Sequence, residues 1–215
     1  MSHGVHAVQH EVEHKIQHDE HGGGGHSQDN SKDLNKKVAL LISVLALFLA
    51  FSETMGKSAQ TAALNSQIEA SNLWNFFQAK NIRRTSTIIA AEQTKLSAAT
   101  ATDPAQKAAI EKQVDEWGKT AARYRSEPEA ANGKGEGTVE LSRRALEEQH
   151  KRDDSLAKYH HYEFASAAFQ IGIVLASSTV ITGIIALSYL AGGLGLIGLA
   201  FMAFGLFAPH AVHLL

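Results

Sequence analysis

Hydrophobic and charged residues are segregated along the chain instead of being mixed. Residues 164–215 contain no Asp, Glu, Lys or Arg, whereas residues 53–163 hold sixteen basic and sixteen acidic residues. A second apolar run covers residues 38–51, and with the small residues that follow it reaches roughly 20 residues, the thickness of a bilayer's hydrocarbon core. The pattern therefore predicts membrane-spanning helices towards both ends of the chain and a charged extramembrane segment between them.

Three transmembrane helices are expected, in residues 34–57, 164–190 and 193–214. The short stretch 191–193, Ala-Gly-Gly, is predicted to be the tight turn between the last two. The third span contains Gly195 and Gly198, and small residues of this kind permit close packing of membrane helices. The fold class predicted is all-α.

The charged segment, residues 58–163, is predicted to be a helical hairpin. Its outgoing helix, residues 58–98, has neither Gly nor Pro and would rise roughly 60 Å. Seven large apolar residues fall roughly on one side of this helix: Leu64, Ile68, Trp74, Phe77, Ile82, Ile88 and Leu96.

The return arm of the hairpin is predicted to be broken into two helices, residues 104–126 and 138–163. Asp103 is a favourable N-cap and Pro104 a favourable first residue for the first of them. The stretch EPEAANGKGEG between them is a loop by composition. Together the two pieces would cover roughly 70 Å, which matches the outgoing helix and indicates a coiled-coil-like hairpin.

Residues 1–31 form a histidine-rich tail that ends in a glycine-rich linker, residues 21–31. Its histidines follow one another at intervals that would place most of them in one stripe on a helix. They are His3, His6, His10, His14, His18, His21 and His26. Neutral imidazoles spaced in this way can chelate Zn, Ni, Co or Cu. The alternatives are a solvated tail whose charge rises below about pH 6.5, and a helix whose valines dip into lipid headgroups.

The composition argues against catalysis and against nucleic-acid binding. The chain has no cysteine, so disulfides and thiolate chemistry are excluded, and its formal net charge is only −2. The glycines of NGKGEGT lack the spacing of a phosphate-binding loop, and we find no nucleophile constellation. We therefore expect a protein that is not an enzyme and has no obligatory cofactor.

The aromatic segment around Trp74 is the other candidate site. Trp74, Phe76 and Phe77 are expected either to form a partner-binding platform or to pack against the return arm, with Lys80 and Arg83 close by in the sequence. The charged pairs Arg83-Arg84 and Arg143-Arg144 are expected to be solvated.

The stretch NKKVALLISVLALFLAFSETMGKSAQTAALNSQIEASNLWNFFQAKNIRRT resembles a bacterial membrane-protein family catalogued only as domain of unknown function number four-three-three-seven. The segment from Asn72 to Lys80 is the most specific part of the resemblance. The resemblance implies a basic-flanked first span and two closing spans, and it implies no reaction, ligand or catalytic residue.

These features predict a protein of the bacterial inner membrane that contacts lipid and assembles with itself or with subunits of a larger complex. Lys32, Lys36 and Lys37 favour a cytoplasmic amino terminus, which would place the hairpin in the periplasm. A cleaved signal peptide over the first apolar run is the alternative interpretation. The expected function is that of a scaffold or accessory subunit, and a metal-handling role of the tail is the second hypothesis.

Overall fold

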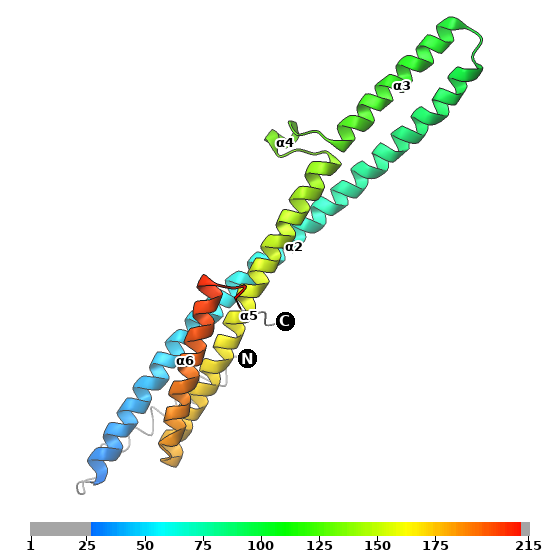
Figure 1. Ribbon diagram of the computed structural model, residues 1–215. Helices are drawn as coiled ribbons and strands as arrows, with labels where there is room; N and C mark the ends of the chain where they lie inside the picture. Colours follow the sequence, from blue (N-terminus) through cyan, green and yellow to red (C-terminus); the bar gives the residue numbers. More distant parts are fainter. Residues whose placement is uncertain (1–26, 212–215) are drawn as a thin grey trace. The chain divides into compact units, whose positions relative to one another are not determined.

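The computed structural model describes residues 27–211, and in this part of the chain the fold is all-α, as predicted (Figure 1). The predicted histidine stripe lies outside the described residues. The chain divides into two units, an apolar unit (described residues 27–62 and 154–211) and a hairpin unit (residues 63–153). The helices are α2 (Ser27–Thr100), α3 (Pro104–Arg125), α4 (Ala130–Gly133), α5 (Thr138–Thr182) and α6 (Ala186–Phe207).

Helix α2 is continuous through the predicted first span and the predicted outgoing helix. It begins at Ser27, inside the predicted linker, so the prediction of a flexible linker is wrong for residues 27–31. Glycine disfavours a helix, and the last glycine before α2 is Gly25. The polar residues that follow Gly25 can start a helix.

Helix α3 starts as the sequence predicted. The Asp103 carboxylate accepts a hydrogen bond of 3.0 Å from the Ala105 amide, and Pro104 is the first helical residue, where its missing N–H costs nothing. The helix ends at Arg125, and the Ser126 amide still bonds the Ala122 carbonyl. In the hairpin unit α3 and the first part of α5 return alongside α2 (Figure 1).

The turn between the last two apolar helices lies at residues 183–185, and the prediction of a turn at 191–193 is wrong. Gly183 adopts a left-handed conformation with φ of +72°, which ends α5 without the steric cost that a Cβ would bring. Gly192 and Gly193 instead lie inside α6, and glycine is more frequent within apolar membrane helices than within soluble ones. The apolar helices therefore end at Thr182 and begin at Ala186, not at 190 and 193.

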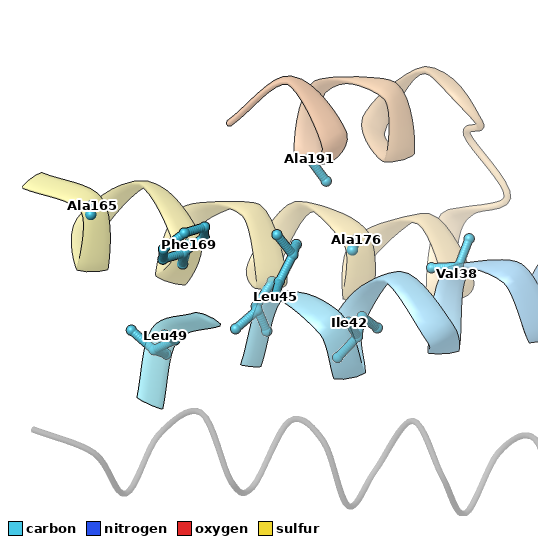
Figure 2. Close-up of a cluster of buried hydrophobic side chains, with 9 residues drawn as sticks. Val38, Ile42, Leu45, Leu49, Ala165, Phe169, Ala176 and Ala191 are labelled. Carbon is cyan, nitrogen blue, oxygen red and sulfur yellow. The ribbon is translucent and has the colours of Figure 1, made fainter. Parts of the chain in front are cut away.

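The apolar unit is built on a core shared by α2, α5 and α6 (Figure 2). Its buried residues are Val38, Ile42, Leu45, Leu49, Ala165, Phe169, Ile173, Ala176 and Ala191. On α2 these positions alternate by four and three residues, the spacing of a helix that packs along one stripe. The three helices of this unit are each long and apolar enough to cross a membrane.

The hairpin unit buries a face of α2 that is made mostly of small residues. We call this face the inner seam, and every residue on it is buried or partly buried. It comprises Ala63, Ser66, Ala70, Leu73, Phe77, Lys80, Arg84, Thr87, Ala91, Thr94 and Ala98. The seven large apolar residues expected on one side of this helix therefore do not form one buried face, because Leu64, Ile68, Ile82 and Leu96 are exposed.

Candidate functional site

A buried lysine lies at the centre of the hairpin unit's polar contacts. The side chain of Lys80 is only 8% exposed, although lysine is almost never buried without a partner. Its ammonium lies 3.2 Å from a carboxylate oxygen of Glu127 and 3.7 Å from one of Glu136. It also lies 5.4 Å from the centre of the Phe76 ring and 5.9 Å from that of Tyr124, within the range of cation–π attraction.

Glu127 and Glu136 are the first and last acidic residues of the loop between α3 and α5. Lys80 of α2 therefore binds both ends of this loop through one charge. The Arg123 guanidinium, 3.7 Å from Glu127, adds a second positive charge. We call this region, where Lys80 meets the loop and the ends of α3 and α5, the junction.

A carboxylate in the first turn of α5 joins the two return helices. Glu140 accepts a 2.5 Å hydrogen bond from the Ser126 hydroxyl and a 3.3 Å bond from the Glu127 amide. Burial acts to raise the pKa of the Glu140 carboxyl, but hydrogen bonds from Ser126 and from backbone amides outweigh it and lower the pKa. The charge also suits the amino end of a helix.

The loop closes so tightly that glycine is required at its end. A Cβ at Gly137 would overlap the Ser126 Cα and the Arg125 carbonyl, which are backbone atoms and cannot rotate away. The Thr138 hydroxyl donates to the same Arg125 carbonyl at 3.3 Å, and Arg144 donates to the Gly135 carbonyl at 3.1 Å. The carboxyl end of α3 and the amino end of α5 therefore abut, and the loop projects from the point where they meet.

The charged groups of the junction hold helices together by ion pairs and hydrogen bonds. The Lys80 ammonium pairs with Glu127 and Glu136, and the Glu140 carboxylate bonds the Ser126 hydroxyl and the Glu127 amide. A neighbouring cleft of about 330 Å³ is lined by both signs of charge, mainly Glu69, Lys134, Arg143, Arg144, Glu147 and Glu148. Arg143 and Glu147 pair within α5 at 2.8 Å, an exposed contact of small energetic value.

The aromatic residues singled out from the sequence have different environments. Trp74 and Phe77 are partly buried, meet edge to face at 5.3 Å, and pack against the core of Leu73, Leu141 and Ala145. Phe76 is 38% exposed and lies under the Lys80 ammonium. Arg83 is exposed, and its carbonyl accepts a hydrogen bond from Thr87.

Gly195 and Gly198 lie on the buried side of α6. A Cβ at Gly195 would come within 2.7 Å of the Leu45 side chain, and one at Gly198 within 2.7 Å of the Phe169 ring. These distances are shorter than atomic contacts allow, so a Cβ at either position would displace the Leu45 or the Phe169 side chain where α6 meets α2 and α5.

The sequence did not single out two buried polar residues of the apolar unit. His161, 1% exposed, bonds the Pro209 carbonyl through Nε2 at 3.0 Å, and the Ser52 hydroxyl donates to the Tyr162 carbonyl at 2.9 Å. Ser52 follows the four-three spacing of the buried α2 positions, and this signal was available in the sequence. His161 lies three residues before a run, residues 164–215, that holds no Asp, Glu, Lys or Arg, which was a weaker signal.

An open cleft of about 470 Å³ lies between α2 and α5 in the apolar unit. Its polar lining includes Ser52, Glu53, Lys57, Gln60, Tyr159, Glu163 and Gln170. Gln170 donates to Glu53 at 3.4 Å and so links α5 to α2, whereas Tyr159 donates to Glu163 within α5, also at 3.4 Å. Among residues 27–211, no group of three or more His, Asp or Glu side chains could hold a metal ion.

A family model described as "Domain of unknown function (DUF4337)" matches residues 34–208 of the chain. The match covers well over half of the sequence and agrees with the resemblance found in the first span and the aromatic segment. The chain belongs to this family. The DUF4337 region contains the junction and both glycine contacts of α6, whereas the histidine stripe precedes it. No match was found among curated proteins, and none among solved structures.

Proposed function

We propose that this DUF4337 protein is a non-catalytic membrane protein that acts through protein–protein interaction, as a self-assembling scaffold or as an accessory subunit of a membrane complex. In this proposal the apolar unit spans a bacterial inner membrane three times and the hairpin unit lies outside the membrane. The apolar length of three helices supports the spanning part of the proposal.

The observation that carries the proposal is the way in which the hairpin unit uses its buried charge. Lys80, Glu127 and Glu136 bind one another, and Glu140 binds the end of α3. These contacts brace two helices into one arm, and a braced helical arm offers a defined surface to a partner. Such a surface suits a scaffold or a subunit better than it suits an enzyme.

For the orientation we propose a cytoplasmic amino terminus and a periplasmic hairpin, in line with the basic residues before the first span. Basic residues also lie near the spans on the other side, so the proposal rests on the first helix, which usually sets the topology.

A second candidate function is metal handling by the amino-terminal tail. The three- and four-residue spacing of the histidines from His3 to His21 favours it, because such pairs chelate Zn, Ni, Co or Cu on one helix face. In that case the tail would deliver ions to the membrane-bound part of the chain or to its partner.

Native mass spectrometry of the untagged protein, extracted gently from its own membrane, tests both candidates. Masses at integer multiples of 23.2 kDa support a self-assembling scaffold, and masses that contain foreign subunits support an accessory role. A monomer of 23.2 kDa with no bound protein contradicts the proposal. Stoichiometric metal adducts that vanish when residues 1–26 are deleted would support the second candidate.

A further inference from the structure

A row of large apolar residues lies on the outward face of α2 within the hairpin unit. Ile68, Ile82, Ile89 and Leu96 are 59%, 66%, 48% and 72% exposed. They recur at intervals of seven residues, and exposed Asn75 occupies the one position in the series that is polar. We call these five residues the outer stripe.

The outer stripe lies opposite the surface that the hairpin itself uses. Ile68 lies two residues from Ser66 and two from Ala70, both on the inner seam. Two residues turn the helix by about 200°, so Ile68 points nearly opposite to both of them. In an isolated helical pair this position faces water and should be the most polar of all. Four of five such positions are instead aliphatic, so the hairpin's own packing does not explain them.

The residues that flank the outer stripe carry no charge over most of its length. On the two adjoining helix positions, residues 64–86 provide only small, amide or aliphatic side chains: Leu64, Asn65, Ser71, Asn72, Gln78, Ala79, Thr85 and Ser86. The first charged residue on this face is Glu92. A solvated helix face in so charged a segment would hold lysines and glutamates, whereas short uncharged side chains let another helix approach closely.

We propose that the outer stripe is the surface on which two copies of this chain pair, with their α2 helices parallel and in register. This inference rests on the proposed membrane function, because insertion in one membrane gives all copies the same orientation. A two-fold axis then places each stripe residue opposite its own copy. A repeat of seven keeps the stripe facing its partner over about 40 Å, the length from residue 68 to residue 96.

The features of the stripe favour a second copy over a different protein. From residue 64 to residue 86 the face carries no charge, so over this length two identical faces meet without repulsion, and it offers no charge there that would select an acidic or basic partner. The Asn75 amide both donates and accepts hydrogen bonds, so it can pair with the same residue of the partner. A single asparagine in an apolar helical repeat fixes the register of a pair in this way.

Cysteine cross-linking in native membranes tests the pairing, and the absence of native cysteine makes single-cysteine variants unambiguous. Ile68→Cys, Ile82→Cys and Leu96→Cys are each expected to give a disulfide-linked dimer on mild oxidation. Arg83→Cys is the matched control, since it is exposed beside Ile82 but points away from the stripe, and it should remain monomeric. Equal cross-linking at Arg83 and Ile82, or none at the stripe, would overturn the proposal.

The register has its own test. Co-expression of Ile68→Cys with Leu96→Cys should yield only same-residue dimers, and a prominent mixed dimer would mean an antiparallel arrangement and would refute the parallel one.

A charge on the stripe should prevent the pairing. When added to the Leu96→Cys variant, Ile82→Asp should lower the yield of disulfide-linked dimer more than tenfold, while Asn81→Asp, an exposed neighbour, should leave that yield unchanged. Circular dichroism of both variants should show unchanged helicity, because Ile82 is exposed in the free chain.

The outcomes separate this inference from the proposed function. If native mass spectra show multiples of 23.2 kDa but the stripe variants do not cross-link, the protein self-assembles through another surface and only the present inference fails. If the spectra show only monomer, the proposed function fails with it.

Discussion

At the scale of the residue, Lys80 shows how this protein makes a buried charge tolerable. Removing an ammonium from water is costly, and the cost is offset only when opposite charges and hydrogen bonds replace the lost hydration. Glu127 and Glu136 supply the charges, and the rings of Phe76 and Tyr124 cover the rest of the group. Because the two carboxylates belong to the loop, the same contacts hold the loop in place.

Lys80→Met should destabilise the hairpin unit by roughly 1–3 kcal/mol, since the methionine keeps the apolar stem but leaves Glu127 and Glu136 without their common partner. The measurement is thermal unfolding in mild detergent, followed by circular dichroism. Lys95→Met, an exposed lysine of the same helix, is the control and should stay close to the parent protein. Similar losses for both variants would argue against the junction.

The Glu140 carboxyl makes the stability of the junction dependent on pH. Its pKa is lowered from an ordinary value of 4.5, with hydrogen bonds from Ser126 and the backbone outweighing burial. A lowered pKa in the folded state contributes stability that is fully present above the unfolded value and is lost as pH falls through the folded one.

Glu140→Gln should therefore show a shallower loss of stability than the parent protein as the pH falls below about 4.5. Ser126→Ala should give an intermediate slope, because it removes one of the donors that lower the pKa. Unfolding by urea at a series of pH values measures the slopes. Parallel curves for the parent and Glu140→Gln would show that this carboxyl does not carry the dependence.

At the scale of the element, the helices meet through their smallest residues. The inner seam of α2 holds four alanines, and α6 turns Gly195 and Gly198 towards Leu45 and Phe169. Small residues bring helix axes close together, so that dispersion contacts extend along the backbone as well as the side chains. Four large aliphatic residues of the hairpin part of α2 are then left on the opposite face, namely Ile68, Ile82, Ile89 and Leu96.

Gly198→Ala should destabilise the apolar unit by about 1–3 kcal/mol, because the new methyl group would overlap the Phe169 ring. Gly193→Ala in the same helix has no atom within 4 Å of its new Cβ and should be neutral or slightly stabilising. Thermal unfolding in detergent compares the two. Adding Phe169→Leu should recover part of the loss at Gly198, and a loss at Gly193 equal to that at Gly198 would be evidence for a turn at 191–193.

At the scale of the whole molecule, the separation of apolar and charged sequence sets how the chain can meet a membrane. Three helices among residues 27–211 are apolar enough to span, and in the proposed arrangement these three spans place residues 27 and 211 on opposite sides of the membrane. The proposed orientation therefore predicts on which side of the membrane each exposed loop lies.

Labelling of single-cysteine variants with a membrane-impermeant maleimide tests that orientation. Lys134→Cys, in the loop before α5, should react in intact cells if the hairpin unit is periplasmic. Ile184→Cys, in the turn before α6 and 54% exposed, should react only after the membrane is permeabilised. The reverse pattern would invert the orientation, and labelling of both from one side would contradict a span between them.

Much of the secondary structure followed from local sequence, and the candidate site followed only in part. Asp103 and Pro104 marked the start of α3 because capping depends on neighbouring residues alone. Lys80 stood out through its position beside Trp74 and Phe77, yet nothing local pairs it with Glu127, 47 residues away. The turn at Gly183 was missed because two adjacent glycines inside α6 gave a stronger local signal.

The sequence by itself determined that residues 27–211 are all-α and that three helices in this range can lie in a membrane, because helical content and hydrophobicity are summed over residues near one another. Only the tertiary structure decided which face of α2 is buried. The fit between two helices selects that face. Here the helices pack closely through alanine, and the larger side chains of Ile68 and Ile82 stay exposed. Hydrophobic periodicity cannot distinguish a surface that packs within the chain from one that awaits another chain, since both remove the same side chains from water.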